Sequence, residues 1–275
     1  MNCLIDITRN TTILFVGNRQ HMKKRRKNPS RLNACGWNSF RPTLFFDDNG
    51  RRRRDVGDDF IRIINDVCTG RTILELCSGG GKLLIQLVKA GFKVTGIDLS
   101  KDMLDICRKK MENEGKVVQE QIRLVQDDIC TFELKEKFDF VILEDDGFMY
   151  LLTQEDQLSC LQQVHAHLAE DGFFFLSFTT PQKELNSSGE FEYDPIHQIK
   201  TQPCVWNVVD ENGRGDTVRE GVERRRLTYP CELELLLQMS GLQPVSRWGD
   251  LQKHPFVDPF SQEYNYLIKK QDNNR

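Results

Sequence analysis

The segment Ile73-Leu74-Glu75-Leu76-Cys77-Ser78-Gly79-Gly80-Gly81-Lys82-Leu83 decides the fold of this chain. Its apolar first half predicts a strand, its glycines a tight turn, and the residues from Lys82 onward a helix. Glycines permit a positive φ and a close approach of the backbone to a ligand, and the following helix offers free N–H groups. This order therefore predicts a ligand site at the turn of a strand-turn-helix unit.

The spacing of the same glycines argues against two nucleotide sites. A phosphate-binding loop for ATP or GTP needs a Ser or Thr after its Lys, but Leu83 follows Lys82. It also needs a glycine at the position of Leu76. A dinucleotide fingerprint that begins at Gly79 needs a third glycine where Leu84 stands, so NAD is disfavoured as well.

Short apolar runs alternate with helical stretches after Gly70, which is typical of βαβ units and a parallel sheet. The predicted strands are Thr72–Leu76, Lys93–Ile97, Ile122–Val125, Phe138–Leu143, Gly172–Thr179, Leu242–Trp248 and Tyr264–Lys269. The predicted helices are Lys82–Ala90, Ser100–Asn113, Gln154–Leu168 and Pro230–Met239, after a helical pattern that begins at Val56. The sequence therefore predicts an α/β fold, a Rossmann-like three-layer sandwich with a seven-stranded mixed sheet.

Residues 181–229 interrupt this rhythm. Two alternating runs, Cys204–Val209 and Thr217–Leu227, flank a turn at Gly213-Arg214-Gly215. Alternation on both sides of a glycine turn is typical of a β-hairpin. We therefore expect an antiparallel hairpin inserted in the α/β frame.

The composition is that of an ordinary soluble globular protein, with 41 acidic and 38 basic residues and a net charge of -3. A dedicated nucleic-acid-binding domain is usually more basic. Nine cysteines without a C-x-x-C pair predict reduced thiols and no zinc ribbon, and we expect no metal site. The stretch Ile13–Val16 is too short to span a membrane and no signal peptide is recognisable, so we expect a cytoplasmic protein without a membrane partner.

Two basic runs, Lys23–Lys27 and Arg51–Arg54, precede the predicted domain. We expect residues 1–54 to form a basic, partly disordered arm, residues 55–270 the folded domain, and residues 271–275 a mobile tail. Runs of like charge are usually solvated, although they also bind anionic polymers. Nucleic acid therefore stays open as a partner without being favoured, and the sequence predicts no oligomeric state.

Carboxylates follow the next two predicted strands. At the end of the second strand, Asp98 can accept hydrogen bonds from both hydroxyls of a ribose, and Asp127-Asp128-Ile129 after the third can read an adenine edge. The motifs E-L-C-S-G-G-G-K-L and I-D-L-S-x-x-M, followed by the Asp pair and F-D-F-V-I-L, resemble those of class I S-adenosylmethionine-dependent methyltransferases. The resemblance covers about residues 58–180 well and continues more loosely to Lys269.

This resemblance implies S-adenosylmethionine as the cofactor, and it implies that the insert at residues 181–229 forms a lid-like wall over the acceptor. In the family, the residue matching Glu75 orients the cofactor ammonium group, and the residue matching Asp98 holds the ribose. The implied cofactor-binding residues are Glu75, Cys77, Gly79, Gly81, Asp98, Leu99, Met103, Asp128, Ile129 and Glu144, with Met103 packing on the adenine and Asp128 and Ile129 contacting its amine. The chain departs from the family at Cys77, where a glycine is usual.

Acceptor chemistry is expected at the loop Glu144-Asp145-Asp146-Gly147-Phe148-Met149-Tyr150, because ligands of open α/β sheets bind beyond the carboxyl ends of the strands. Its carboxylates can hold a cationic amine or remove a proton, although a solvated acidic turn is the alternative. The insert adds His197, which can serve as a general base near neutral pH. The predicted catalytic residues are Glu144, Asp146, Tyr150 and His197.

We therefore predict a methyltransferase (EC 2.1.1) that transfers a methyl group from S-adenosylmethionine to nitrogen or oxygen of a small-molecule acceptor. Its arrangement is similar to that of the small-molecule N-methyltransferases, including those that act on amino sugars and glycine. Two alternatives stay open. One is an RNA methyltransferase that uses the basic arm, and the other is a catalytically inactive, cofactor-binding partner subunit.

Overall fold

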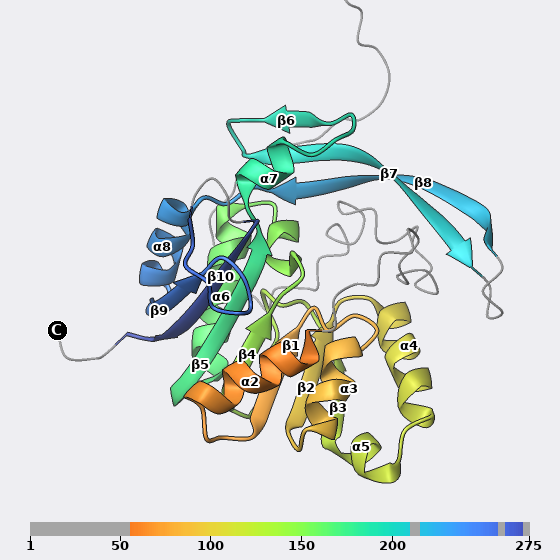
Figure 1. Ribbon diagram of the computed structural model, residues 1–275, viewed down its shortest axis with the longest axis vertical. Coiled ribbons are helices and arrows are strands. Elements are labelled where there is room, and N and C mark those ends of the chain that lie inside the picture. The colour runs from red at the N-terminus through yellow and green to blue at the C-terminus, as the bar shows by residue number, and fades with distance from the viewer. Residues whose placement is uncertain (1–55, 210–214, 258–261, 272–275) are drawn as a thin grey trace, which may run out of the picture.

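The computed structural model describes residues 56–209, 215–257 and 262–271 (Figure 1). The predicted basic arm 1–54 lies outside the described residues. So do Gly213 and Arg214 of the predicted hairpin turn, and residues 272–275 of the predicted tail.

A seven-stranded mixed sheet forms the centre of the molecule, with the strand order β3-β2-β1-β4-β5-β10-β9. Its strands are β1 (Thr72–Leu76), β2 (Lys93–Asp98), β3 (Ile122–Gln126), β4 (Phe138–Leu143), β5 (Leu168–Thr179), β9 (Leu242–Trp248) and β10 (Glu263–Lys270). The first five strands pair in parallel, and β10 is antiparallel to both β5 and β9. The predicted Rossmann-like sheet is confirmed.

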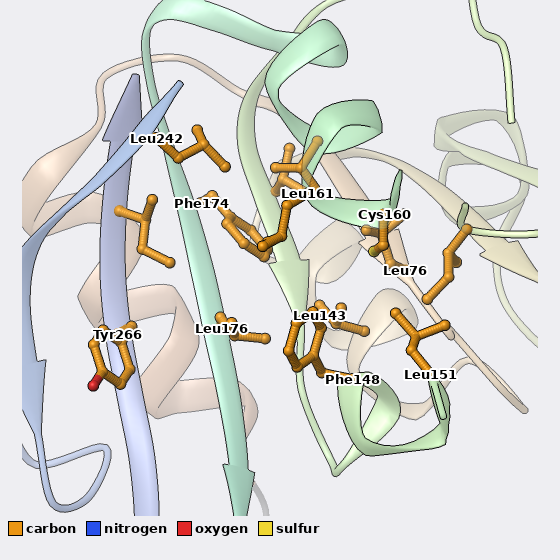
Figure 2. Close-up of a cluster of buried hydrophobic side chains, with 14 of the residues drawn as sticks. Leu76, Leu143, Phe148, Leu151, Cys160, Leu161, Phe174, Leu176, Leu242 and Tyr266 are labelled. Atoms are coloured by element: carbon orange, nitrogen blue, oxygen red, sulfur yellow. The ribbon is translucent and has the colours of Figure 1, made fainter. Parts of the chain in front are cut away.

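Helices cover both faces of this sheet (Figure 1). They are α2 (Gly57–Val67), α3 (Lys82–Lys89), α4 (Lys101–Glu112), α5 (Lys116–Gln121), α6 (Gln154–His167) and α8 (Pro230–Met239). The apolar residues of α2 and α3 pack on one face, and those of α6 and α8 on the other. Figure 2 shows Leu143, Phe174 and Leu176 of neighbouring strands with Leu161 of α6 in this second cluster. Burial on both faces explains the continuous apolar runs of the central strands.

A second, three-stranded sheet fills the predicted insert. It consists of β6 (Glu192–Asp194), β7 (Ile199–Val209) and β8 (Gly215–Arg226), all antiparallel, and we call it the lid sheet. Its strands lie beyond the carboxyl ends of the central strands (Figure 1). The antiparallel insert is confirmed, although β7 begins five residues before the predicted run because Ile199–Thr201 also pairs with β6.

Two short elements follow β4 and β5 at the same end of the sheet. The 3-10 helix η3 (Gly147–Tyr150) comes after β4, and α7 (Pro181–Leu185) comes after β5. The Thr180 side chain caps α7 by accepting a hydrogen bond from the Lys183 N–H at 3.2 Å. Among the described residues, no helix has the length and apolar character to cross a membrane.

Candidate functional site

The turn between β1 and α3, which we call the glycine-rich loop (Cys77–Gly81), has three residues with positive φ. They are Cys77 at 58°, Gly79 at 52° and Gly81 at 71°. A Cβ atom at Gly81 would lie 2.2 Å from Cys107 Sγ, so this position needs glycine for both space and conformation. Cys77 adopts the left-handed conformation that the glycine usual in the family would adopt without strain.

Glu75 lies beneath this loop, one residue before the end of β1. The residue is 5% exposed, and its Oε2 atom has no hydrogen-bond partner. Burial raises the pKa of Glu75 well above its usual value of 4.5, and the carboxylates of Glu144 and Asp98 raise it further. A buried acceptor without a donor is a costly arrangement, and a cationic ligand would relieve it.

Asp98, the last residue of β2, fixes the loop from the side. Its Oδ2 accepts a hydrogen bond from the Gly79 N–H, and its Oδ1 accepts one from the Ser100 N–H, both at 2.8 Å. Burial raises the pKa of Asp98, whereas these two hydrogen bonds lower it. Each carboxylate oxygen has a second lone pair, so Asp98 can still accept hydrogen bonds from a ligand.

The other implied adenosine-binding residues lie at the same edge of the sheet, and Met103 approaches the loop itself. Met103, in the first turn of α4, is 7% exposed, and its Cε lies 3.2 Å from the position of a Cβ built on Gly79. Asp128 is 5% exposed and accepts a hydrogen bond from the Cys130 N–H at 2.9 Å, and Ile129 is 7% exposed. Leu99 is half-buried next to Asp98. These residues follow β2 and β3 at the carboxyl edge of the sheet.

Lys110 is a contact of the loop that the sequence reasoning missed. Its Nζ donates a hydrogen bond to the Gly80 carbonyl at 2.8 Å, and burial lowers the pKa of Lys110. Met103, Cys107 and Lys110 are spaced by four and three residues along α4, so they share the face that meets the glycine-rich loop. This spacing in the sequence could have indicated that Lys110 contacts the loop.

The loop after β4 approaches the glycine-rich loop. A Cβ placed on Gly147 would lie 3.2 Å from Cys77 Sγ. Glu144 is half-buried, and its carboxylate is near enough to raise the pKa of Glu75. The structure therefore brings Glu144 together with Glu75 and Asp98.

Asp146 and Tyr150 from the same loop face the lid sheet. Asp146 accepts hydrogen bonds from the Thr179 N–H at 2.7 Å and from Arg225 at 3.0 Å. The Tyr150 hydroxyl donates to Glu223 Oε1 at 2.6 Å, and burial raises the pKa of Tyr150 well above 10.0. Both side chains thus belong to a buried ionic network.

His197, by contrast, lies in the turn between β6 and β7 with its side chain 68% exposed. Its Nδ1 lies 2.6 Å from Asp194 Oδ2. The structure does not place this side chain in the ionic network or among the residues that surround the glycine-rich loop.

The ionic network contains four charged residues that the sequence reasoning did not place in the site. They are Glu184 of α7, Lys200 of β7, and Glu223 and Arg225 of β8. Lys200 is 2% exposed and bonds Glu184 Oε2 at 2.8 Å. No pattern in the sequence signalled this cluster, because its members come from separate elements. In the part of the chain that the structure describes, no group of three or more His, Cys, Asp or Glu side chains could hold a metal ion.

Comparison with known proteins gives matches over the residues that carry this site. Residues 73–172 match a family described as methyltransferase domain. Glycine/sarcosine N-methyltransferase from Aphanothece halophytica is 26% identical over 218 residues, which cover 74% of this chain and 77% of that protein. The chain spans less than half the length of the first curated relatives that it matches, 44% and 47%.

Solved structures with a similar backbone extend the match to most of the chain. An S-adenosylmethionine-dependent methyltransferase from Clostridium acetobutylicum ATCC 824 has a TM-score of 0.72 and 20% identity, and the match covers 82% of this chain and 96% of that one. The glycopeptide N-methyltransferase MtfA, complexed with (S)-adenosyl-L-methionine, has a TM-score of 0.60 and 21% identity over 83% of this chain and 91% of that one. These likenesses show a shared fold.

Proposed function

We propose that this chain is a class I methyltransferase, as the resemblance of its sequence implies, and that it transfers a methyl group from S-adenosylmethionine to a nitrogen or oxygen of a small-molecule acceptor. S-adenosylmethionine is the ligand in the MtfA structure. The observation that carries the proposal is Glu75, a buried carboxylate with an unpartnered oxygen beneath a glycine-rich loop.

The residues around the loop fit the cofactor. Glu75 would bind the ammonium group of its methionine end, because a cation relieves the unpartnered Oε2 atom. Asp98 would accept hydrogen bonds from the ribose hydroxyls with its remaining lone pairs. Met103 would pack on the adenine, and Asp128 with Ile129 would contact its amine. When bound, the cofactor supplies an electrophilic methyl group on a sulfonium.

Methyl transfer asks the protein to hold a nucleophile in line with that methyl group and to exclude water. Glu144 is the residue of the loop after β4 that we assign to the acceptor, because its carboxylate lies near Glu75. A carboxylate there favours an acceptor that carries an amine, since it can hold the cation or take its proton. Asp146 and Tyr150 support this loop from the ionic network. The exposed side chain of His197 pairs with Asp194, and we do not assign it to the acceptor.

A small-molecule acceptor is favoured over a polymer by the position of the lid sheet. This sheet lies beyond the carboxyl ends of the central strands, where it can close over an acceptor (Figure 1). The glycine/sarcosine N-methyltransferase from Aphanothece halophytica, which by its name acts on two small amines, matches 74% of this chain and therefore more than its methyltransferase-domain segment.

Calorimetric titration of the full chain tests the proposal. We expect binding of S-adenosylmethionine and S-adenosylhomocysteine, and no binding of NAD or ATP. A panel of glycine, sarcosine, an amino sugar and a short RNA, assayed for transfer of radiolabelled methyl, then identifies the acceptor class. Folded protein that binds neither adenosyl ligand would overturn the proposal, and methylation of the RNA alone would replace the small-molecule acceptor with RNA.

A further inference from the structure

The turn after β4, which we call the acidic turn (Glu144–Asp146), has two consecutive non-glycine residues in the left-handed conformation. The φ angles are 55° for Asp145 and 65° for Asp146. Side chains disfavour this conformation, which persists where the surrounding structure holds it. The first stabilising interaction is made by the Asp146 carboxylate with Thr179. Its Oδ1 accepts a hydrogen bond from the Thr179 N–H at 2.7 Å, and its Oδ2 accepts one from the Thr179 hydroxyl at 3.2 Å.

Arg225 of the lid sheet makes the second stabilising interaction. Its Nη1 donates to Asp146 Oδ2 at 3.0 Å and to Glu184 Oε1 at 2.9 Å, and its Nη2 donates to Glu223 Oε1 at 2.8 Å. The side chain is 20% exposed. One planar guanidinium therefore joins the acidic turn, α7 and the lid sheet in a fixed geometry, which a lysine could not reproduce.

The same strand also holds the far end of η3. The Tyr150 hydroxyl donates to Glu223 Oε1 at 2.6 Å, and the Arg225 guanidinium carbon lies 5.7 Å from the centroid of the Tyr150 ring. Asp146 directly precedes η3 and Tyr150 is its last residue, so both ends of this segment are fixed to β8. Glu144 lies two residues before Asp146 in the same turn. The position of its side chain therefore depends on where Asp146 is held.

The charges of the ionic network make Arg225 hard to replace. Asp146, Glu184 and Glu223 contribute three carboxylates, which face the cations Arg225 and Lys200. Lys200 bonds Glu184 and does not reach the acidic turn in the described contacts. Without Arg225, three largely buried carboxylates would share one cation, and their repulsion would separate the turn from the lid sheet.

We propose that Arg225 is a positioning residue for methyl transfer, which holds the acidic turn in its left-handed form and thereby sets the place of Glu144 beside Glu75. The inference rests on the proposed function, because the place of Glu144 matters to the reaction only if this turn receives the methyl acceptor. Arg225 acts through Asp146 and Tyr150 and is assigned no contact with cofactor or acceptor. The acceptor side of the site is therefore complete only with the lid sheet docked.

Hydrogen exchange measured by mass spectrometry on the full chain tests this role. Three amides report on the turn: Gly147 N–H bonds the Glu144 carbonyl at 3.2 Å, Met149 N–H the Asp146 carbonyl at 2.9 Å, and Leu151 N–H the Phe148 carbonyl at 3.2 Å. The variants are Arg225→Gln, Arg225→Lys and the control Arg224→Gln. Arg224 is the preceding residue of β8, so the alternation of a strand places it on the opposite face.

We expect exchange of these amides to be at least tenfold faster in Arg225→Gln. The amides of β1 and the dissociation constant of S-adenosylhomocysteine should stay within threefold of wild type. Arg225→Lys should be intermediate, and Arg224→Gln should match wild type. Because Glu144 contributes to the raised pKa of Glu75, releasing the turn should also shift the pH profile of S-adenosylmethionine binding to lower pH, which a uniform loss of stability would not do.

Wild-type exchange of the turn amides in folded Arg225→Gln would overturn the proposal. If Arg225→Gln does not fold, the exchange of the turn amides is measured in Arg225→Lys instead. Wild-type protection of these amides in Arg225→Lys would then refute the positioning role. The two inferences fail separately. Absence of S-adenosylhomocysteine binding in the wild type would remove the proposed function, whereas unchanged turn exchange with intact binding would remove only the role of Arg225.

Discussion

Replacing Glu75 by glutamine should have opposite effects on stability and on cofactor affinity. The substitution keeps the size and shape of a side chain that is 5% exposed, and it removes the charge. In the protein without cofactor, the ionised carboxyl has an Oε2 atom without a donor and lies near the carboxylates of Glu144 and Asp98. Glutamine removes this repulsion, but it also removes the group that would bind the cofactor ammonium.

The two magnitudes follow from the kind of interaction that changes. Keeping an ionised carboxylate buried beside two other carboxylates costs about 1–3 kcal/mol, so Glu75→Gln should raise the melting temperature of the cofactor-free protein by roughly 3–10 °C at pH 8. A hydrogen bond to a charged group contributes about 1.5–3 kcal/mol, so its loss should weaken S-adenosylmethionine binding by roughly 10- to 150-fold. A residue that merely packs in the core would lower stability and leave affinity unchanged.

The pH dependence gives the stability effect a definite sign. The pKa of Glu75 is higher in the folded chain than the usual value of 4.5, so the folded state binds this proton more tightly than the unfolded state. The stability that this difference contributes is present below about pH 4.5 and is lost as the pH rises through the folded pKa. The advantage of Glu75→Gln should therefore be small near pH 4.5 and increase toward pH 8.

Thermal unfolding at several pH values, with and without S-adenosylmethionine, together with calorimetric titration, measures both effects. The matched control is Glu136→Gln. Glu136 lies in the segment before β4, and its exposed carboxylate pairs with Arg123 of β3. The control substitution should change neither the affinity nor the pH dependence. An unchanged affinity in Glu75→Gln, or a destabilisation that is the same at every pH, would refute the assignment of Glu75 as the ammonium ligand.

Three further substitutions test the frame of the same site. Asp98→Ala removes the acceptor of the Gly79 N–H, which is also the acceptor that we propose for the ribose. Titration with S-adenosylhomocysteine should therefore show at least tenfold weaker binding, and a change within twofold would contradict the proposed role. Gly96→Ala would place a Cβ 2.5 Å from Leu84 Cδ1. This clash should lower the free energy of unfolding, measured in urea, by about 1–3 kcal/mol. An unchanged midpoint would show that the core rearranges to accept the methyl group. Lys110→Met removes the hydrogen bond from Lys110 to the glycine-rich loop. Its loss should weaken S-adenosylhomocysteine binding by roughly fivefold, or about 1 kcal/mol. Wild-type affinity in this variant would contradict a role of Lys110 in shaping the loop.

The strands of the central sheet could be predicted from sequence because their burial leaves a pattern. Phe138–Leu143 is an apolar run covered on both faces, and its predicted bounds match those of β4. Helix α8 also matches, since a proline begins it and Ser240-Gly241 follows it. Strand β5 begins at Leu168 rather than at the predicted Gly172, because Leu168 pairs with Phe138 across a break in the register. That pairing is a tertiary contact without a local signal.

The gathering of the proposed cofactor-binding residues at one sheet edge could be predicted for a related reason. Its residues end consecutive strands along one sheet edge, so the order strand, carboxylate, helix places them together before any contact is known. The hydrogen bond from the Gly79 N–H to Asp98 joins two such strand ends. Lys110 was missed because a lysine on a helix is solvated by default, although its spacing from Met103 places it on the face of α4 that meets the loop.

The acceptor side could not be predicted in the same way, because its contacts join residues that are far apart in the sequence. Arg225 bonds Asp146 across 79 residues, and a hairpin arginine is expected at the surface. The segment that matches the methyltransferase family ends at residue 172, whereas Glu184, Lys200, Glu223 and Arg225 all follow it. The shared segment therefore contains the residues that would bind the cofactor, and the insert contains those that hold the acidic turn.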